Sequence, residues 1–265
     1  MTEAITKTDI KNFNNDGVVV LRGVFKDWIE VLRRGAEFHI NNPSESALIH
    51  KQDSYQGQFM EDFCNWQRIA EYKDFVLNSP LGSFAADLTE SKSIQFFHDH
   101  FFYKEASSGV ATPWHQDMPY YCVSGLQTVS FWMPLESREQ SVSLKCAAGS
   151  HSFLKEIRPT SWSNNESFYE DSEAFMDMPN IDNDNFEIKQ WATEPGDVVA
   201  FNFKTIHSAN ANTMGGVSRT LSFRLLGDDV RYRQRPGRTS PNFPDINQKN
   251  GERLREDWFP TIWSN

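Results

Sequence analysis

The stretch TPWHQDMPYY at residues 112–121 places a histidine and an aspartate two positions apart in a segment that we predict to be extended. Alternate residues of a β-strand point to the same face of a sheet. His115 and Asp117 can therefore bind one metal ion together. The third ligand should be a histidine on a distant strand that the fold brings back beside them.

His207 is the candidate for this third ligand. It ends the run FNFKTIH at residues 201–207, which reads as a strand because the turn EPGD at residues 194–197 precedes an apolar run. Two histidines and one carboxylate on one side of an iron(II) ion form a facial triad and leave three coordination positions open. The sequence therefore predicts an iron site.

An arginine follows His207 after twelve residues, at position 219. Because arginine is planar and permanently charged, Arg219 is the candidate to bind a carboxylate of a co-substrate. Arg224 is the rival, and in a regular strand it should face the opposite side. His98 and His100 form a second pair that shares one strand face, and we interpret them as polar residues that line the interior.

Together these residues resemble the phytanoyl-CoA dioxygenase family of iron(II)/2-oxoglutarate-dependent oxygenases, roughly from Ser91 to Val230. The resemblance implies a mainly β fold with flanking helices, built on a double-stranded β-helix, which is a cupin-like jelly-roll barrel. It also implies iron(II), 2-oxoglutarate and O2 as cofactor and co-substrates. The residues that it assigns are the metal ligands His115, Asp117 and His207 and the 2-oxoglutarate contacts Arg219, Trp132 and His100. Where the family often has Gly-Ser after the distal histidine, this chain has Ser208 and Ala209.

The composition narrows the class of partner and the compartment. The formal net charge of −10 and the pI near 5.2 argue against nucleic-acid binding, which depends on clustered lysine and arginine. Three cysteines without a C-x-x-C spacing predict neither a disulfide framework nor a zinc-thiolate site, and they favour a reducing cytoplasm. Residues 1–7 lack the apolar core of a signal peptide, and no apolar run is long enough to span a membrane.

A length of 265 residues fits one jelly roll with helical additions, so we predict a single oxygenase domain. Its parts would be a strand and buttressing helices at 1–90, the jelly-roll core at 91–230 and a C-terminal tail at 231–265. Apolar spacing predicts helices at 8–15, 28–40, 63–77 and 81–89. The acidic segment 166–186 reads as a long surface loop. The basic segment 231–238 is interpreted as either a charged lid or a solvated surface.

These observations favour an iron(II)- and 2-oxoglutarate-dependent dioxygenase, a hydroxylase of a small organic molecule that releases succinate and carbon dioxide. A halogenase of the same family would need a small residue at position 117 so that halide reaches the iron, and Asp117 argues against it. The alternative is not an enzyme but a non-catalytic, cupin-like protein with a small-molecule-binding or regulatory role. The sequence leaves the substrate and the oligomeric state open.

Overall fold

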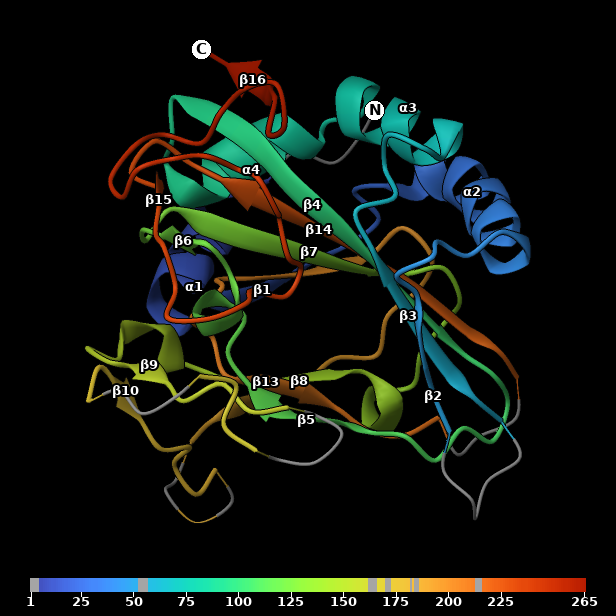
Figure 1. Ribbon diagram of the computed structural model, residues 1–265. Coiled ribbons are helices and arrows are strands. Elements are labelled where there is room, and N and C mark those ends of the chain that lie inside the picture. The colour runs from blue at the N-terminus through green and yellow to red at the C-terminus, as the bar shows by residue number, and fades with distance from the viewer. Residues whose placement is uncertain are drawn as a thin grey trace.

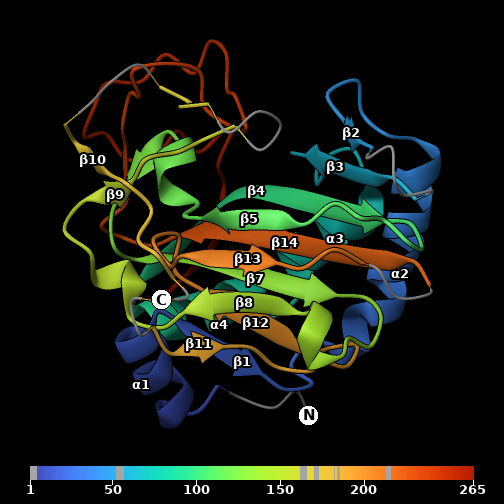
Figure 2. The ribbon, with the colours of Figure 1, turned by 90° about the horizontal axis from the view of Figure 1, so that it is seen from below.

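Two antiparallel sheets face each other in the computed structural model, which describes residues 5–51, 57–161, 166–169, 173–181, 183, 186–212 and 216–265 (Figure 1; Figure 2 views them from the side of the smaller sheet). The larger sheet has the order β1 (Val18–Leu21), β12 (Val198–Phe201), β7 (Thr128–Pro134), β14 (Ser218–Leu226), β4 (Ser93–Lys104), β3 (Phe59–Phe63) and β2 (Leu48–His50), with β16 (Thr261–Ser264) also paired to β4. The smaller sheet has the order β11 (Ile188–Lys189), β8 (Leu144–Ala147), β13 (His207–Ala209) and β5 (Thr112–His115). This arrangement is the jelly roll that the family resemblance implies.

Strand β14 shows why the larger sheet has two different faces. Leu221, Phe223 and Leu225 belong to the main hydrophobic core, which also contains side chains of the helices. Thr220 and Arg224 point to the other face and line a pocket between the sheets. Because side chains alternate along a strand, the apolar set faces the helices while the polar set faces the smaller sheet.

The helices cover the outer face of the larger sheet (Figure 1). Their bounds are α1 (Lys7–Asp16), α2 (Ile29–Asn41), α3 (Ala70–Asn78) and α4 (Leu81–Thr89). The prediction of a helix from residue 63 was wrong at its start. Phe63 ends β3 and pairs with β4. The carboxylate of Asp99 holds the turn that follows, because it accepts hydrogen bonds from the backbone N–H groups of Asn65 and Trp66 at 3.0 and 2.8 Å. The helix can begin only after this turn.

Phe75 on α3 should be a major source of stability. Its ring is fully buried and lies 5.1, 5.6 and 4.7 Å from the ring centroids of Phe25, Trp28 and Phe223. We expect Phe75→Ala to lower the free energy of unfolding by about 3–5 kcal/mol, because it removes buried apolar surface and leaves a cavity. Leu77 on the same helix is 45% exposed, so Leu77→Ala should change it by less than about 0.5 kcal/mol. Urea unfolding of both variants measures the difference, and equal losses would contradict this view of the core.

The C-terminal segment packs onto the jelly roll. Strand β15 (Arg231–Tyr232) pairs with β6 (Val123–Ser124), and β16 extends the larger sheet beside β4. The interpretation of the basic segment 231–238 as a solvated surface is wrong for Arg235, which is buried. Its guanidinium donates to the backbone carbonyls of Met118 and Tyr121 at 2.6 and 2.7 Å and pairs with Glu156 at 2.6 Å. This arginine braces the turn that follows Asp117. Among the described residues, no helix is long and apolar enough to cross a lipid bilayer.

Candidate metal centre

The smaller sheet brings the three predicted metal ligands together. His115 ends β5 and His207 opens β13, and the two residues are direct partners in the antiparallel register. Nε2 of His115 lies 3.6 Å and Nε2 of His207 lies 3.8 Å from Oδ1 of Asp117. These distances are too long for good hydrogen bonds, but one ion can bind all three atoms, which lie within 4.8 Å of one another.

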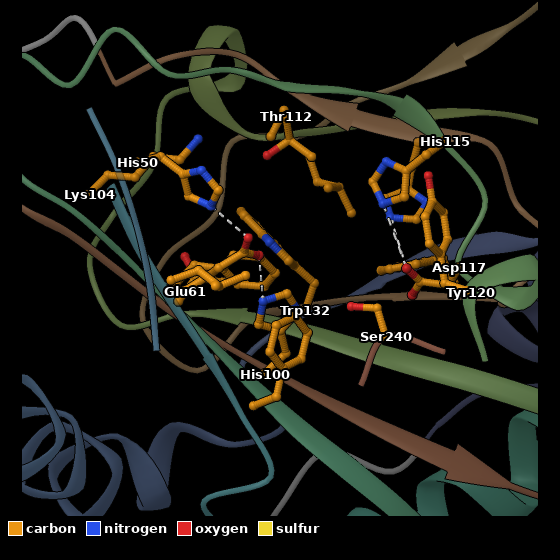
Figure 3. A pocket seen from close by; sticks show the side chains of 18 of the residues that line it. His50, Glu61, His100, Lys104, Thr112, His115, Asp117, Tyr120, Trp132 and Ser240 are labelled. Atoms are coloured by element: carbon orange, nitrogen blue, oxygen red, sulfur yellow. Dashed lines mark hydrogen bonds and ion pairs between the residues drawn. The ribbon is translucent and has the colours of Figure 1, made fainter. Parts of the chain in front are cut away.

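The backbone at Asp117 differs from the extended segment that we predicted. Strand β5 ends at His115, and Asp117 has φ −73° and ψ −42°, a helical conformation at the start of a short turn. The carboxylate therefore reaches the site from a turn after the strand, and strand alternation does not place it there. Figure 3 shows the side chains of His115 and Asp117 directed toward each other at one end of the pocket.

Hydrogen bonds to the backbone orient both imidazoles. Nδ1 of His115 lies 2.8 Å from the carbonyl oxygen of Pro113, and Nδ1 of His207 lies 2.9 Å from that of Thr205. Since a carbonyl can only accept, each Nδ1 carries the proton and each Nε2 presents a lone pair. Burial and the neighbouring His115 lower the pKa of His207 to about 3, so this imidazole is neutral at pH 7. Neutral imidazoles are the form that binds a metal ion.

The carboxylate of Asp117 is held as an anion. Burial alone would raise its pKa, but the guanidinium of Arg224 holds the pKa well below its ordinary value. Its Oδ2 accepts hydrogen bonds from Ser130 at 3.2 Å and Arg224 at 3.3 Å, which leaves Oδ1 directed at the histidines. Two imidazole nitrogens and one ionised carboxylate fit a divalent iron ion.

Arg224 is buried against the candidate metal ligand Asp117. Besides Asp117, its guanidinium donates to the hydroxyl of Tyr121 at 3.0 Å and to the carbonyl of Ser222 at 3.1 Å. These contacts neutralise Asp117 and fix the plane of the guanidinium. Sequence reasoning missed Tyr121 and Ser130, because neither residue type in its local pattern signals a site.

Arg219 lies outside the pocket. Its Nε and Nη2 pair with Oε1 of Glu136 at 2.8 and 2.7 Å, and its Nη1 lies 3.7 Å from Glu37 on helix α2. The residue shares the helix-facing side of β14 with Leu221. The structure therefore does not bring Arg219 to the metal ligands, and it places the rival Arg224 there instead. Ser208 likewise does not line the pocket, whereas its neighbours His207 and Ala209 do.

Trp132 and His100, which we predicted as co-substrate contacts, line the same pocket as the candidate metal ligands (Figure 3). Each is a direct partner of Ser222 in the larger sheet, Trp132 from β7 and His100 from β4. The cavity has a volume of about 240 Å³. The acidic segment 166–186 lies partly outside the described residues, and of its described part Phe168 lines the pocket.

A carboxylate flanked by two histidines forms another wall of the pocket. Glu61 accepts from Nε2 of His50 at 2.7 Å and from Nε2 of His100 at 3.0 Å. The ring of His100 lies between those of Phe63 and Phe102, with ring centroids 3.8 and 3.7 Å away. Burial would raise the pKa of Glu61, but hydrogen bonds from the two imidazoles lower it to about 2. The wall therefore carries an ionised carboxylate at neutral pH.

His100 should make stability depend on pH. Burial lowers its pKa from 6.5 to about 4, although Glu61 opposes this. Below pH 6.5 the unfolded chain binds a proton at this histidine and the folded protein does not, so stability falls as the pH falls from 6.5 toward 4. When the pH is lowered from 6.5 to 5, we expect the free energy of unfolding of the metal-free native protein to fall by about 2 kcal/mol more than that of His100→Gln. One pKa unit corresponds to about 1.4 kcal/mol. Urea unfolding at the two pH values tests this, and parallel losses would contradict it.

Comparison with known proteins agrees with this geometry. A jelly roll that presents two histidines and an aspartate to its interior defines a class of metal-dependent oxygenases. The phytanoyl-CoA dioxygenase (PhyH) family matches residues 13–221, and the chain belongs to this family of enzymes. No curated protein matches the chain in sequence.

Several solved structures share the fold. The non-heme alpha ketoglutarate dependent carbocyclase SnoK from nogalamycin biosynthesis has a TM-score of 0.75 at 18% identity, covering 98% of this chain and 97% of that chain. The epimerase SnoN, solved with Fe3+, alpha ketoglutarate and nogalamycin RO, has a TM-score of 0.76 at 16% identity, covering 97% of this chain and 98% of that chain. EctD from S. alaskensis, solved with 2-oxoglutarate and 5-hydroxyectoine, has a TM-score of 0.70 at 16% identity, covering 94% of this chain and 85% of that chain. At these identities the likeness shows the fold, and the chemistry of this chain has to be argued from its own residues.

Proposed function

We propose that this enzyme binds iron(II) through His115, Asp117 and His207 and uses 2-oxoglutarate and O2 to hydroxylate a small organic molecule. The observation that carries the proposal is the convergence of two Nε2 lone pairs and one carboxylate oxygen at the wall of a 240 Å³ cavity. When bound, iron and 2-oxoglutarate supply the oxidising chemistry, and the co-substrate leaves as succinate and carbon dioxide. Family membership and the iron- and 2-oxoglutarate-bound relatives support it.

The chain's own residues bind and orient the reactants and exclude water. We assign contact with a carboxylate of 2-oxoglutarate to Arg224, because it is buried, lines the pocket and lies beside the metal ligand Asp117. Arg219 does not fit this role, since its guanidinium is engaged by Glu136 on the helix-facing side of β14. Trp132 and His100 remain our candidates for further co-substrate contacts. Both pair with Ser222, which lies two residues before Arg224 on β14.

The experiment that tests the function is a screen of small organic molecules for substrate-stimulated succinate formation by the iron-loaded enzyme. For each active compound, turnover under ¹⁸O2 shows whether the product has gained an oxygen atom. Incorporation of labelled oxygen supports hydroxylation. Succinate formation with an unlabelled product would leave the oxygenase class intact but overturn hydroxylation, and a native protein that binds no 2-oxoglutarate would overturn the whole proposal.

A cytoplasmic location is also part of the proposal. Cys64, Cys122 and Cys146 are all free, and the described structure contains no disulfide between them. Free thiols without disulfides are usual in reducing compartments. The net charge of −10 fits an enzyme that acts on a small molecule better than one that acts on nucleic acid.

A further inference from the structure

We propose that the part of the pocket wall next to the candidate metal ligands binds an uncharged ring of the primary substrate, and that Phe168 selects for it. This part, which we call the ring wall, consists of Tyr120, Thr160, Ser161, Phe168 and Ser240. All five belong to uncharged residue types. Figure 3 shows Tyr120 and Ser240 at the end of the pocket that holds Asp117. The assignment to the primary substrate rests on the proposed function.

Backbone pairing in the chain after β9 (Glu156–Ile157) brings Phe168 to the pocket. Thr160 and Ser167 form an antiparallel bridge, and the backbone N–H of Phe168 donates to the carbonyl oxygen of Pro159 at 2.8 Å. The side chains of Thr160 and Phe168 both line the pocket. Regular hydrogen bonding therefore places the ring of Phe168 at the wall.

Tyr120 connects this segment to the turn after Asp117. Its hydroxyl donates to the carbonyl oxygen of Thr160 at 2.7 Å and accepts from the N–H of Thr160 at 3.0 Å. The N–H of Ser240 donates to the carbonyl oxygen of Tyr120 at 2.9 Å. These hydrogen bonds hold the ring wall together before a ligand binds, which lowers the ordering cost of binding.

Two aromatic rings give the ring wall an apolar surface. The ring of Phe168 lies 5.2 Å from that of Tyr120 at an interplanar angle of 66°, and the ring of Tyr120 lies 6.2 Å from that of His115. Since the hydroxyl of Tyr120 is engaged by Thr160, Tyr120 offers its ring to a ligand. Phe168 is only partly buried and lines the cavity. A ligand ring can pack against this pair in an offset or edge-to-face geometry, which adds to the gain from burying apolar area.

The charges around the ring wall already have partners. Arg224 pairs with Asp117 at 3.3 Å and is our candidate for the co-substrate carboxylate, and Arg235 pairs with Glu156 at 2.6 Å. An ionised substrate group at the ring wall would lose its hydration without gaining a counter-ion from the wall, and burial of an unpaired charge is costly. The hydroxyl of Ser240 can instead bond to a neutral alcohol, ether or carbonyl group. The wall therefore favours an uncharged ligand.

Benzyl alcohol, benzoate and benzylamine are the probes, because they share one ring and differ in charge. Their binding is measured by ligand-observed NMR on the full-length protein with Zn(II) in place of iron and saturating 2-oxoglutarate, so that the co-substrate position is filled. We expect benzyl alcohol to bind at least about tenfold more tightly than either charged probe. In soaked crystals its ring should lie against Phe168. Equal or tighter binding of a charged probe, no binding of benzyl alcohol, or a ring located elsewhere would overturn the proposal.

Variants of Phe168 provide the matched comparison. Phe168→Ala should weaken benzyl alcohol binding by about fivefold or more, while its affinity for 2-oxoglutarate stays within twofold of native. Phe168→Lys should reverse the preference, so that benzoate binds more tightly than benzylamine. The control is Phe186→Ala, which removes another partly buried ring that does not line the pocket and should keep both affinities. Native binding of benzyl alcohol by Phe168→Ala would overturn the role of Phe168.

Failure of this inference and failure of the proposed function give different results. If the native protein with metal does not bind 2-oxoglutarate, the proposed function fails. Crystals soaked with benzyl alcohol in the absence of metal and 2-oxoglutarate then still decide whether the ring wall binds an uncharged ring. If 2-oxoglutarate binds and benzyl alcohol does not, the proposed function stands and the ring wall is overturned.

Discussion

Replacing His207 by alanine should abolish substrate-stimulated succinate formation and weaken iron(II) binding by more than about 100-fold. Loss of a residue that merely orients a metal ligand typically costs 10- to 100-fold in metal affinity or activity, and His207 is itself a ligand in our proposal. Its imidazole lies 3.8 Å from the carboxylate of Asp117, and its Nδ1 is already held by the carbonyl of Thr205. No other described side chain at the site can replace its Nε2. Anaerobic iron titration and single-turnover assays measure the two losses separately.

The fold should survive this change, because His207 faces the cavity and lies outside the main hydrophobic core. Thermal unfolding of the metal-free protein checks that His207→Ala stays folded. His151→Ala is the matched control, since His151 does not line the pocket and bonds the backbone carbonyl of Asn14, so the change should leave iron affinity unchanged. Full turnover of His207→Ala with added iron would refute the metal assignment.

The convergence of His115, Asp117 and His207 could be predicted from sequence because this combination of residue types is rare and its spacing is regular. A histidine and an aspartate two residues apart are close along the chain, so their side chains can meet without any long-range contact. This holds for a regular strand and also for a strand followed by a turn, which is the case here. His207 required a long-range inference. It held because an antiparallel jelly roll pairs β13 with β5 and places His207 directly opposite His115.

The choice between Arg219 and Arg224 could not be made from the alternation of side chains along a strand. Alternation correctly put Arg219 and Arg224 on opposite faces of β14, but it does not say which face is the interior of the jelly roll. The apolar residues Leu221 and Phe223 could have answered this. In a sheet covered by helices, the apolar face packs against the helices and the polar face is left for the site, so the arginine that shares its face with Thr220 and Ser222 is the one that enters the pocket.

The wall of the pocket opposite the metal could not be predicted. Glu61 and His50 come from β3 and β2, two strands that continue the larger sheet beyond β4. The helical spacing that we saw from residue 63 placed a helix where β3 in fact ends. Nothing in the local sequence of Lys104 indicates that its side chain is buried, since that depends on the pairing of β4 with β3. Such residues become visible only when the strand order is known.

Arg224→Met should weaken 2-oxoglutarate binding by about thirtyfold or more and also destabilise the metal-free protein. Breaking a buried, hydrogen-bonded charge pair costs about 2–5 kcal/mol, and thirtyfold corresponds to about 2 kcal/mol. In the native protein the guanidinium lies 3.3 Å from Asp117 and donates to Tyr121 at 3.0 Å. The variant leaves Asp117 buried without this cation, so we expect a loss of about 3–5 kcal/mol in the free energy of unfolding without metal.

The two effects of Arg224→Met can be separated by adding the metal. Iron(II) would replace the missing positive charge beside Asp117, so saturating iron should restore part of the lost stability, whereas it cannot restore a missing contact with the co-substrate. Arg224→Lys should recover charge but only part of the affinity, because a point charge cannot reproduce a planar fork. Arg219→Met is the matched control, and its affinity for 2-oxoglutarate should stay within twofold of native because its partner is Glu136. If the affinity falls in Arg219→Met and not in Arg224→Met, the face of β14 that binds the co-substrate has been assigned the wrong way round.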